Sequence, residues 1–384
     1  MHVVVVGGGF GGVKAALELS KKQIGRVTLI SDESYFLHHA TLYATATGKN
    51  FAESILPLNT IFANHPNVEL VQDKITSFDP KRRLVTGKKD YHYDKLVLAL
   101  GSVTTYFGIE GMKQHSYGIK SVNQIKDFHE HIHEELVHQK LDKEYFVIGA
   151  GSTGVEMAAA LNDYLKQLIT TYRLKQTASK VTLVEAAPRI VPHLSKSASS
   201  LVTRQLKKQG INVRVNHRVG ALEGNKIVIE GKSYPTTTAI WTSGVANNPF
   251  YKHNADSFNL SDTGRVNVNP YLEALDNVYV IGDNNTVRYS GTAWPTLKQA
   301  KHVAHNITRL ATKRPQERFH PASAPAGIPL GENWGYVEWF GVYVAGRSGA
   351  FARRLMELYG YCQILPFKQA IPVWRAHELA AVDE

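Results

Sequence analysis

The stretch Val3-Val4-Val5-Val6-Gly7-Gly8-Gly9-Phe10-Gly11-Gly12 decides how the chain begins to fold. Four consecutive valines are typical of a strand buried on both faces, and the glycines after them predict a tight turn. Residues 13–19 have the apolar spacing of a helix, and residues 26–30 predict a second strand. In such a turn Gly7 permits the bend, Gly9 lets the backbone approach a pyrophosphate, and Gly12 lets helix and strand pack closely. The helix N-terminus would then offer N–H groups and a favourable dipole to the phosphates.

The same pattern returns in the middle of the chain. Residues 146–157 again predict a strand, a Gly149-x-Gly151-x-x-Gly154 turn and a helix, and a further strand at 181–184 ends in Glu185. An acid at this place accepts hydrogen bonds from ribose hydroxyls and repels a 2′-phosphate, which favours NADH over NADPH, although the nearby Arg189 complicates that preference. The interval from Gly154 to Glu185 exceeds the usual ~20 residues, so we expect an extended helix or loop.

Length and composition predict a multidomain globular protein without a membrane span. The chain has 384 residues, and this length is more than one hydrophobic core usually holds. Its residues are 43% hydrophobic and 20% charged, which is ordinary for a globular protein. No segment reaches the ~18 uninterrupted apolar residues of a transmembrane helix. Because the first strand begins almost at Met1, we expect no signal peptide and a cytoplasmic location. The single cysteine, Cys362, suits a reducing compartment and excludes an internal disulfide.

The net charge of +11 predicts an acidic partner. Phosphate ligands, anionic lipid and nucleic acid all carry the required charge. No compact run of Lys and Arg interleaved with aromatic residues is present, and no nucleic-acid-binding module is recognisable, so nucleic acid is not expected. An anionic membrane surface is the better hypothesis.

The order of elements predicts an α/β fold with two Rossmann-like domains, the second inserted into the first, and a small C-terminal domain. Between the strands, residues 37–49 indicate a loop or short helix and residues 74–94 an antiparallel meander. Helices are expected at 121–140 and at about 295–311. The predicted domains are 1–120 and 256–324 for the first, discontinuous fold, 121–255 for the inserted one, and 325–384 for the aromatic-rich tail.

Two dinucleotide-binding patterns and a returning strand that ends in Gly282-Asp283 resemble the flavoproteins with two dinucleotide-binding domains. Within them, the chain resembles the type II NADH:quinone oxidoreductases, which are single-subunit enzymes that do not pump protons. The similarity covers roughly residues 1–310. It is carried by residues 7–12, Leu42-Tyr43 with Ala46-Thr47-Gly48, residues 99–101, 149–156 and 184–189, Trp241-Thr242-Ser243-Gly244 and residues 281–283.

This resemblance implies FAD in the first fold and NADH in the second, with a hydride passing to the flavin and two electrons then passing to a membrane quinone. The implied FAD-binding residues are Gly7, Gly9, Phe10, Gly11, Gly12, Ser31, Asp32, Ala99, Gly101, Gly282, Asp283 and Lys298. The implied NADH-binding residues are Gly149, Gly151, Ser152, Thr153, Gly154, Glu185, Ser243 and Gly244. The implied acceptor pocket consists of Ala293, Trp294, Pro295 and Thr296.

The chain differs from the family pattern at two of these places. Ser31 stands where the family would place an acid at the end of the second strand, and Asp32 follows one residue later. Trp294 and Lys298 replace two glutamines of the stretch that lines the family's quinone pocket. The tail also matches the family's membrane-anchoring region poorly.

Three charged residues carry the expected chemistry, and each has a simpler structural explanation. Glu156 matches the family's acid near nicotinamide and flavin, where it would orient the ring or relay a proton; otherwise it stabilises the helix dipole. Asp283 would accept a hydrogen bond from the ribityl chain, or else cap the next helix. Lys298 would stabilise the reduced flavin, or else lie in solvent.

Other patterns limit the alternatives. The chain has no cysteine after the first fold's second strand, which excludes disulfide reductases and sulfide oxidases. His129-Glu130-His131-Ile132-His133 matches a zinc motif, but no third ligand is indicated, so we expect a solvated helix face and no metal. His38-His39 is expected to shape a loop. Electrons therefore leave to a quinone, to a small redox protein such as an iron–sulfur protein or other carrier, or to oxygen. A non-catalytic NADH-binding redox sensor is a further hypothesis.

The tail from Pro325 mixes apolar, aromatic and basic residues. Residues 353–359 have helical spacing and begin with the adjacent arginines Arg353 and Arg354, and residues 364–375 continue the mixture. Such a segment can lie in a lipid interface with its aromatic side chains down and its cations toward the headgroups. The alternative is a domain interface or a homodimer interface.

Overall fold

A parallel sheet organises the first of two α/β units in the computed structural model, which describes residues 1–175 and 178–378. Its strand order is β19-β20-β9-β1-β2-β5, and all but the edge strand β19 run parallel. The strands are β1 (His2–Val6), β2 (Arg26–Ser31), β5 (Val68–Gln72), β9 (Lys95–Leu98), β19 (Glu273–Leu275) and β20 (Val278–Val280). Strands β19 and β20 follow the second unit in the chain and return to this sheet.

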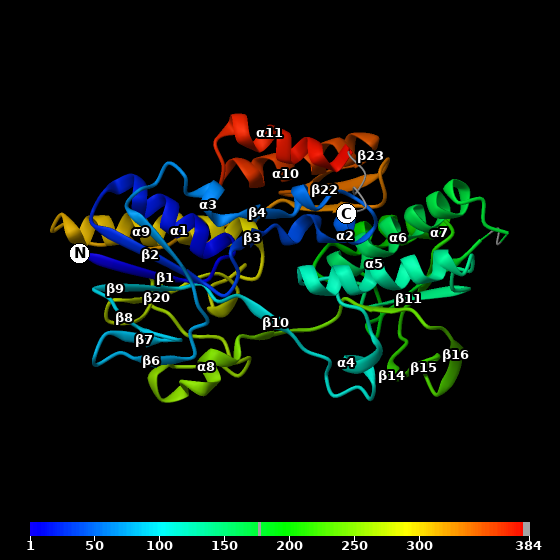
Figure 1. Ribbon diagram of the computed structural model, residues 1–384, viewed down its shortest axis with the longest axis horizontal. Helices are drawn as coiled ribbons and strands as arrows, with labels where there is room; N and C mark the ends of the chain where they lie inside the picture. The colour runs from blue at the N-terminus through cyan, green and yellow to red at the C-terminus, as the bar shows by residue number, and fades with distance from the viewer. Residues whose placement is uncertain (176–177, 379–384) are drawn as a thin grey trace.

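The four valines of β1 are buried because the sheet is covered on both faces. Val3 and Val5 pack with helices α1 (Phe10–Lys22) and α9 (Ala293–Ala311). Val4 and Val6 pack against the antiparallel meander and α8 on the other face. The meander consists of β6 (Ser77–Asp79), β7 (Leu84–Thr86) and β8 (Asp90–His92), and α8 spans Pro249–His253. Figure 1 shows the helices above the sheet and the meander below it.

A second parallel sheet, in the order β13-β12-β11-β17, organises the other unit. Its strands are β11 (Glu144–Ile148), β12 (Lys180–Val184), β13 (Asn212–Arg214) and β17 (Ala239–Trp241). One face carries α5 (Val122–Val137), α6 (Ser152–Thr171) and α7 (Lys196–Lys208). The other packs on α4 (Met112–His115) and on the hairpins of β14 (Val219–Glu223), β15 (Lys226–Ile229) and β16 (Lys232–Pro235). The long α6 accounts for the wide interval between Gly154 and Glu185.

Two antiparallel strands join the units. The chain leaves the first sheet through β10 (Ser102–Thr104) and returns through β18 (Val245–Asn247), and these strands pair with each other. Figure 1 shows this ribbon crossing between the two units. A second bridge is short: after β3 (Tyr35–Leu37) and η1 (His39–Thr41), helix α2 (Leu42–Ala46) lies against α5 and α6. The predicted loop or short helix at 37–49 is confirmed.

Several small elements complete the first unit. They are η2 (Phe51–Glu53), β4 (Ile55–Pro57), which pairs with β3, α3 (Leu58–Ile61), η3 (Ala255–Ser257) and η4 (Gly282–Asn284).

The tail forms a three-stranded antiparallel sheet followed by two helices. Its strands are β21 (Ala326–Pro329), β22 (Gly335–Trp339) and β23 (Val342–Gly346), and its helices are α10 (Arg347–Cys362), α11 (Phe367–Arg375) and the short η5 (Ala376–Glu378). Tyr361 and Ile364 join the core of the first unit, whereas Ile328 and Tyr336 join that of the second. The tail therefore lies across both units, at the top of Figure 1. No helix within the described residues is both long and apolar enough to span a bilayer.

The histidines of the zinc-like motif on α5 are only partly solvated. His129 Nε2 lies 3.0 Å from the Thr45 carbonyl oxygen, and His131 Nε2 lies 2.7 Å from Thr238 Oγ1 while its ring stacks on Tyr117. Only His133 is exposed, so the expectation of a solvated face is wrong for the first two. Their polar atoms are used to fix α5 to its neighbours, which the motif alone did not indicate. Among the described residues, none form a group of three or more side chains suited to a metal.

Candidate functional site

The first glycine loop joins strand and helix at main-chain contact distance. A Cβ on Gly12 would overlap the carbonyl oxygen of Gly7, and Gly7 itself has a φ of 119°, which disfavours other residues. Gly9, by contrast, has no atom within 4 Å of its hypothetical Cβ. Gly9 is also the N-cap of α1, and no side chain caps that helix. The loop thus presents free N–H groups to open space, which is the arrangement that binds a diphosphate.

The carboxyl ends of the parallel strands bring several predicted FAD residues together around this loop. A Cβ on Gly11 would lie 3.1 Å from Thr296 Cγ2, 3.2 Å from Ala99 Cβ and 3.3 Å from Ile281 Cδ1. The N–H of Gly282 donates to Gln299 Oε1 over 2.8 Å. Because ligands of open α/β sheets bind at this edge, the geometry fits a dinucleotide.

Ser31 and Asp32 are placed differently at the end of β2. The hydroxyl of Ser31 is packed beneath Gly8, where any added Cβ would overlap it, and its Oγ accepts from the N–H of Glu33 over 3.2 Å. Asp32 is exposed beyond the strand. The Ser31 hydroxyl is thus occupied, whereas the Asp32 carboxylate is open to solvent. The contact with the FAD ribose remains a prediction, and Asp32 is the residue that could make it.

The second glycine loop repeats the geometry of the first. A Cβ on Gly154 would overlap the carbonyl oxygen of Gly149 and lie 2.6 Å from Thr242 Oγ1, whereas Gly151 faces open space. Ser243 lies against Gly149, and its Oγ donates to the Ile148 carbonyl over 3.1 Å. Ser152 and Thr153 open α6 directly after this loop. The predicted NADH residues therefore share the carboxyl edge of the second sheet.

Glu185 ties its strand to the second glycine loop. Its Oε2 accepts from the N–H of Ala150 over 2.7 Å, and its Oε1 accepts from the N–H of Ala187 over 2.8 Å. Each carboxylate oxygen keeps a lone pair for a ribose hydroxyl. Arg189 donates instead to the carbonyls of Leu194, at 2.8 Å, and Pro192. Since its guanidinium is held by its own loop, the geometry favours NADH over NADPH.

Glu156 lies buried in the first turns of α6, and Arg353 and Glu357 of the tail helix α10 are the charged groups that act on it. Burial raises its pKa to about 8, the Arg353 guanidinium opposes this, and the Glu357 carboxylate adds to it. Arg353 is 6% exposed; it donates to Glu357 Oε1 over 3.0 Å and to the Ala40 carbonyl over 3.2 Å. Arg354 also binds Glu357. A buried acid that titrates near neutral pH can hold or deliver a proton.

This cluster corrects the expectation that Arg353 and Arg354 face lipid headgroups. Both guanidiniums turn inward to Glu357, which is 2% exposed. Sequence reasoning missed Arg353 and Glu357 as neighbours of Glu156. The one available signal was their i, i+4 spacing, which indicates a pair on one helix face but not which face is buried.

Comparison with known proteins agrees with this geometry. The family model described as pyridine nucleotide-disulphide oxidoreductase matches residues 1–306. The chain belongs to this family. It is 28% identical to the type II NADH:quinone oxidoreductases of Staphylococcus epidermidis and Staphylococcus aureus, over 92% of this chain and 94% of each relative. The resemblance inferred from the motifs is confirmed, with its FAD and NADH cofactors.

Solved structures of the family confirm the fold. NDH2 from Plasmodium falciparum in complex with NADH superposes with a TM-score of 0.87 at 15% identity, covering 98% of this chain and 97% of that one. The sulfide:quinone oxidoreductase of Aquifex aeolicus superposes with a TM-score of 0.79 at 23% identity, covering 94% and 91%. The predicted α/β class with two Rossmann-like domains and a C-terminal domain is thus confirmed.

The start of α9, which is predicted to line the acceptor pocket, carries a Trp–Tyr stack. Trp294 stacks on Tyr359 of α10 with 4.8 Å between ring centroids, and Lys298 Nζ lies 5.3 Å from the Trp294 ring. Lys298 is exposed, so its geometry favours the solvated alternative. Pro295 and Thr296 are buried at the start of α9, and Ala293 is half-buried there. Trp294 therefore links this helix to the tail.

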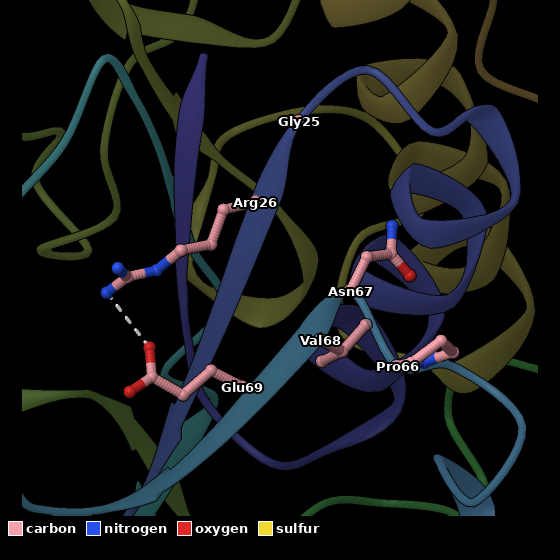
Figure 2. Close-up of a pocket in the computed structure, with 6 residues that line it drawn as sticks. All are labelled: Gly25, Arg26, Pro66, Asn67, Val68 and Glu69. Carbon is pink, nitrogen blue, oxygen red and sulfur yellow. Dashed lines mark ion pairs between the residues drawn. The ribbon is translucent and has the colours of Figure 1, made fainter.

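A shallow pocket at the opposite edge of the first sheet is separate from these sites. Figure 2 shows Gly25 and Arg26 of the β2 start beside residues 66–69, with Arg26 pairing with Glu69 at 3.0 Å. It lies at the amino ends of β2 and β5, away from the glycine loop. Because dinucleotides bind at the carboxyl ends of parallel strands, this pocket lies outside the candidate cofactor sites.

The two kinds of glycine in the first loop predict different variant behaviour. Gly12→Ala should lower the free energy of unfolding by about 3 kcal/mol, because the added methyl overlaps a main-chain oxygen. Gly9→Ala should change it by less than about 0.5 kcal/mol but weaken FAD binding, since its methyl projects into the open space of the loop. Urea denaturation of apoprotein and FAD titration measure both. Unchanged FAD affinity in Gly9→Ala would contradict the placement.

The raised pKa of Glu156 predicts a pH-dependent stability. Between the ordinary glutamate pKa of 4.5 and the folded value of about 8, the native state binds one proton more than the unfolded state. The free energy of unfolding should therefore fall as pH rises through this window, by up to about 1.4 kcal/mol per pH unit relative to Glu156→Gln. Parallel urea titrations of the two proteins at pH 5–9 measure the difference. Identical slopes would exclude a protonated native Glu156.

Proposed function

We propose that this protein is an FAD-dependent NADH dehydrogenase that reduces a membrane quinone without pumping protons. The observation that carries the proposal is Glu156, a buried acid with a pKa of about 8, set at the junction of the second glycine loop's helix, the α2 segment and the tail. The names and extent of the staphylococcal relatives support the same reaction. The overall balance is NADH, a proton and a quinone giving NAD⁺ and a hydroquinone.

We assign the cofactors by the two glycine loops. The first α/β unit would hold FAD, the second would hold NADH, and residues 325–384 would form the tail. When bound, FAD accepts a hydride from NADH and passes two electrons on. The loops at Gly7–Gly12 and Gly149–Gly154 bind the two diphosphates, and Glu185 selects the unphosphorylated ribose. Asp283, at the strand end, accepts a hydrogen bond from the ribityl chain; its Oδ2 already accepts one from Ser102 over 2.8 Å.

Glu156 supplies the proton chemistry. A carboxyl with this pKa is largely protonated at neutral pH and can give its proton to a reduced acceptor, then regain one. Arg353 keeps the carboxylate form accessible, because without a cation the buried charge would be costlier. The acceptor would enter along the start of α9, where Trp294 and Tyr359 form one wall.

Stopped-flow spectroscopy tests the reaction. NADH should bleach the bound flavin rapidly, and a short-chain quinone should then reoxidise it over repeated turnovers. Glu156→Gln should keep flavin reduction within a few-fold but slow quinone-dependent reoxidation by about 10²-fold, in line with the loss of a general acid. Rapid turnover with an iron–sulfur carrier and none with quinone would favour the carrier reductase. Slow reduction to a persistent NADH complex would favour the sensor.

We further propose that the tail attaches the protein to the cytoplasmic face of the membrane. Helix α10 is inverted relative to an ordinary surface helix: Arg353 and Glu357 face inward, while Phe351, Leu355 and Tyr359 are exposed at every fourth position. The neighbouring hairpin exposes further apolar side chains, namely Trp339, Phe340, Val342, Tyr343 and Val344. Exposed apolar surface flanked by the exposed cations Arg347 and Lys368 suits an anionic lipid interface.

Vesicle sedimentation tests the attachment. The double variant Phe340→Ser/Phe351→Ser should lose at least tenfold in binding to anionic vesicles, because two exposed phenyl groups no longer enter the interface. Phe107→Ser/Val137→Ser is the matched control, since these residues are equally exposed but lie off the tail. Unchanged vesicle binding, together with a concentration-dependent dimer that the tail variant abolishes, would show that this surface is a homodimer interface.

A further inference from the structure

The loop after β12 is fastened to the second glycine loop through the main chain of Ala150. The N–H of Ala150 donates to Glu185 Oε2 over 2.7 Å, and its carbonyl oxygen accepts from the N–H of Val191 over 2.7 Å. Val191 is buried and has a φ of 40°, a conformation that a β-branched residue rarely adopts. Such strain persists only where the surrounding structure fixes it. Residues 186–195 are therefore a built wall of the second glycine loop.

His193 is held in this wall from both sides. The Arg189 guanidinium donates to the carbonyl oxygens of its two chain neighbours, Leu194 at 2.8 Å and Pro192. Ser195, two residues on from His193, is the N-cap of α7. The main chain around His193 is thus fixed before any ligand arrives.

The His193 imidazole lies at the first turn of α6. Its Nε2 is 3.2 Å from Oγ of Ser152, the residue that follows the N-cap Gly151. No side chain caps this helix, so its first N–H groups are open to a ligand. A diphosphate bound to them would lie next to the exposed imidazole.

The charges around His193 keep its imidazole largely neutral near pH 7 in the free protein. Burial lowers its pKa below the ordinary 6.5, and the Arg189 guanidinium lowers it further. The surrounding elements contribute Glu185 after β12, Glu156 one turn further along α6, and Lys196 at the start of α7. The two negative charges of a diphosphate would favour the protonated imidazole and so raise this pKa.

We propose that His193 is a cofactor-binding residue that takes up a proton when NADH binds and donates a hydrogen bond to the diphosphate. This inference deepens the proposed function, because it rests on NADH occupying the second glycine loop. The charge-assisted bond is stronger than a bond from the neutral ring. The affinity for NADH therefore rises as the pH falls from the pKa of His193 in the complex to its lower pKa in the free protein. NAD⁺ carries the same diphosphate, so substrate and product are affected alike.

Calorimetric titration of the FAD-bound protein with ADP-ribose tests the inference. ADP-ribose carries the diphosphate but no nicotinamide, and both of its phosphates are esterified, so the ligand does not titrate between pH 6 and pH 8. Between pH 8 and pH 6 the affinity of the native protein should rise about tenfold more than that of His193→Gln. Because Glu156 also titrates in this range, the difference between the two proteins is the measure.

Two further variants and a buffer comparison sharpen the test. His193→Lys should keep at pH 8 most of the affinity that the native protein reaches at pH 6, because its ammonium group stays charged. His133→Gln, on the exposed surface of α5, is the matched control and should show the native pH dependence. Titrations near pH 7 in buffers of different ionisation enthalpy should show proton uptake in the native protein that His193→Gln lacks.

Other outcomes would overturn the inference. An equal loss of affinity in His193→Gln at both pH values would mean that the imidazole only supports the loop. Unchanged affinity at both pH values would mean that it does not reach the diphosphate. No electron acceptor enters these titrations, so a normal pH dependence without quinone turnover would contradict only the proposed function. Absence of ADP-ribose binding would contradict the assignment of the second glycine loop, on which both proposals rest.

Discussion

The close approach of a helix to a strand at Gly7 and Gly12 is the constraint on which the first dinucleotide site depends. Any side chain at residue 12 would collide with the Gly7 carbonyl, so α1 reaches the strand only because a hydrogen stands there. That approach aims the N-terminus of α1 at the edge where β1, β9 and β20 end. Gly149 and Gly154 repeat the contact in the second unit. Two helix dipoles are thereby fixed before any ligand contact is made.

The tail brings charge to a place that neither dinucleotide fold supplies on its own. Arg353 contacts the Ala40 carbonyl of the first unit and lies beside Glu156 of the second. Removing one partner of such a buried pair typically destabilises a protein by about 3–5 kcal/mol, because the other charge is left uncompensated. Tyr361 adds a neutral bond by donating to the Glu53 carbonyl over 2.5 Å. The same contacts that hold α10 against the two units therefore also set the electrostatic environment of Glu156.

Local pattern was sufficient for most of the fold and for part of the site. The valine run, the two glycine loops and the Gly282-Asp283 strand end depend on neighbours in sequence, and periodicity reports such neighbours well. Arg353 and Glu156 are far apart in the chain, and nothing local shows that they meet. For the same reason local pattern predicts that the adjacent arginines face lipid and that His129 and His131 face solvent, and both predictions are wrong.

The inverted helix α10 carries the exposed apolar side chains and the buried charges of the tail on the same few turns. Because the exposed side chains alternate with Arg353 and Glu357 in sequence, a truncation that removes the exposed side chains of α10 also removes the two buried charged residues. Loss of the tail would release the protein from any surface that the outer side chains bind, and it would also strip Glu156 of its cation. A form freed by truncation would therefore also be altered in its chemistry, whereas single substitutions on the outer face could change location alone.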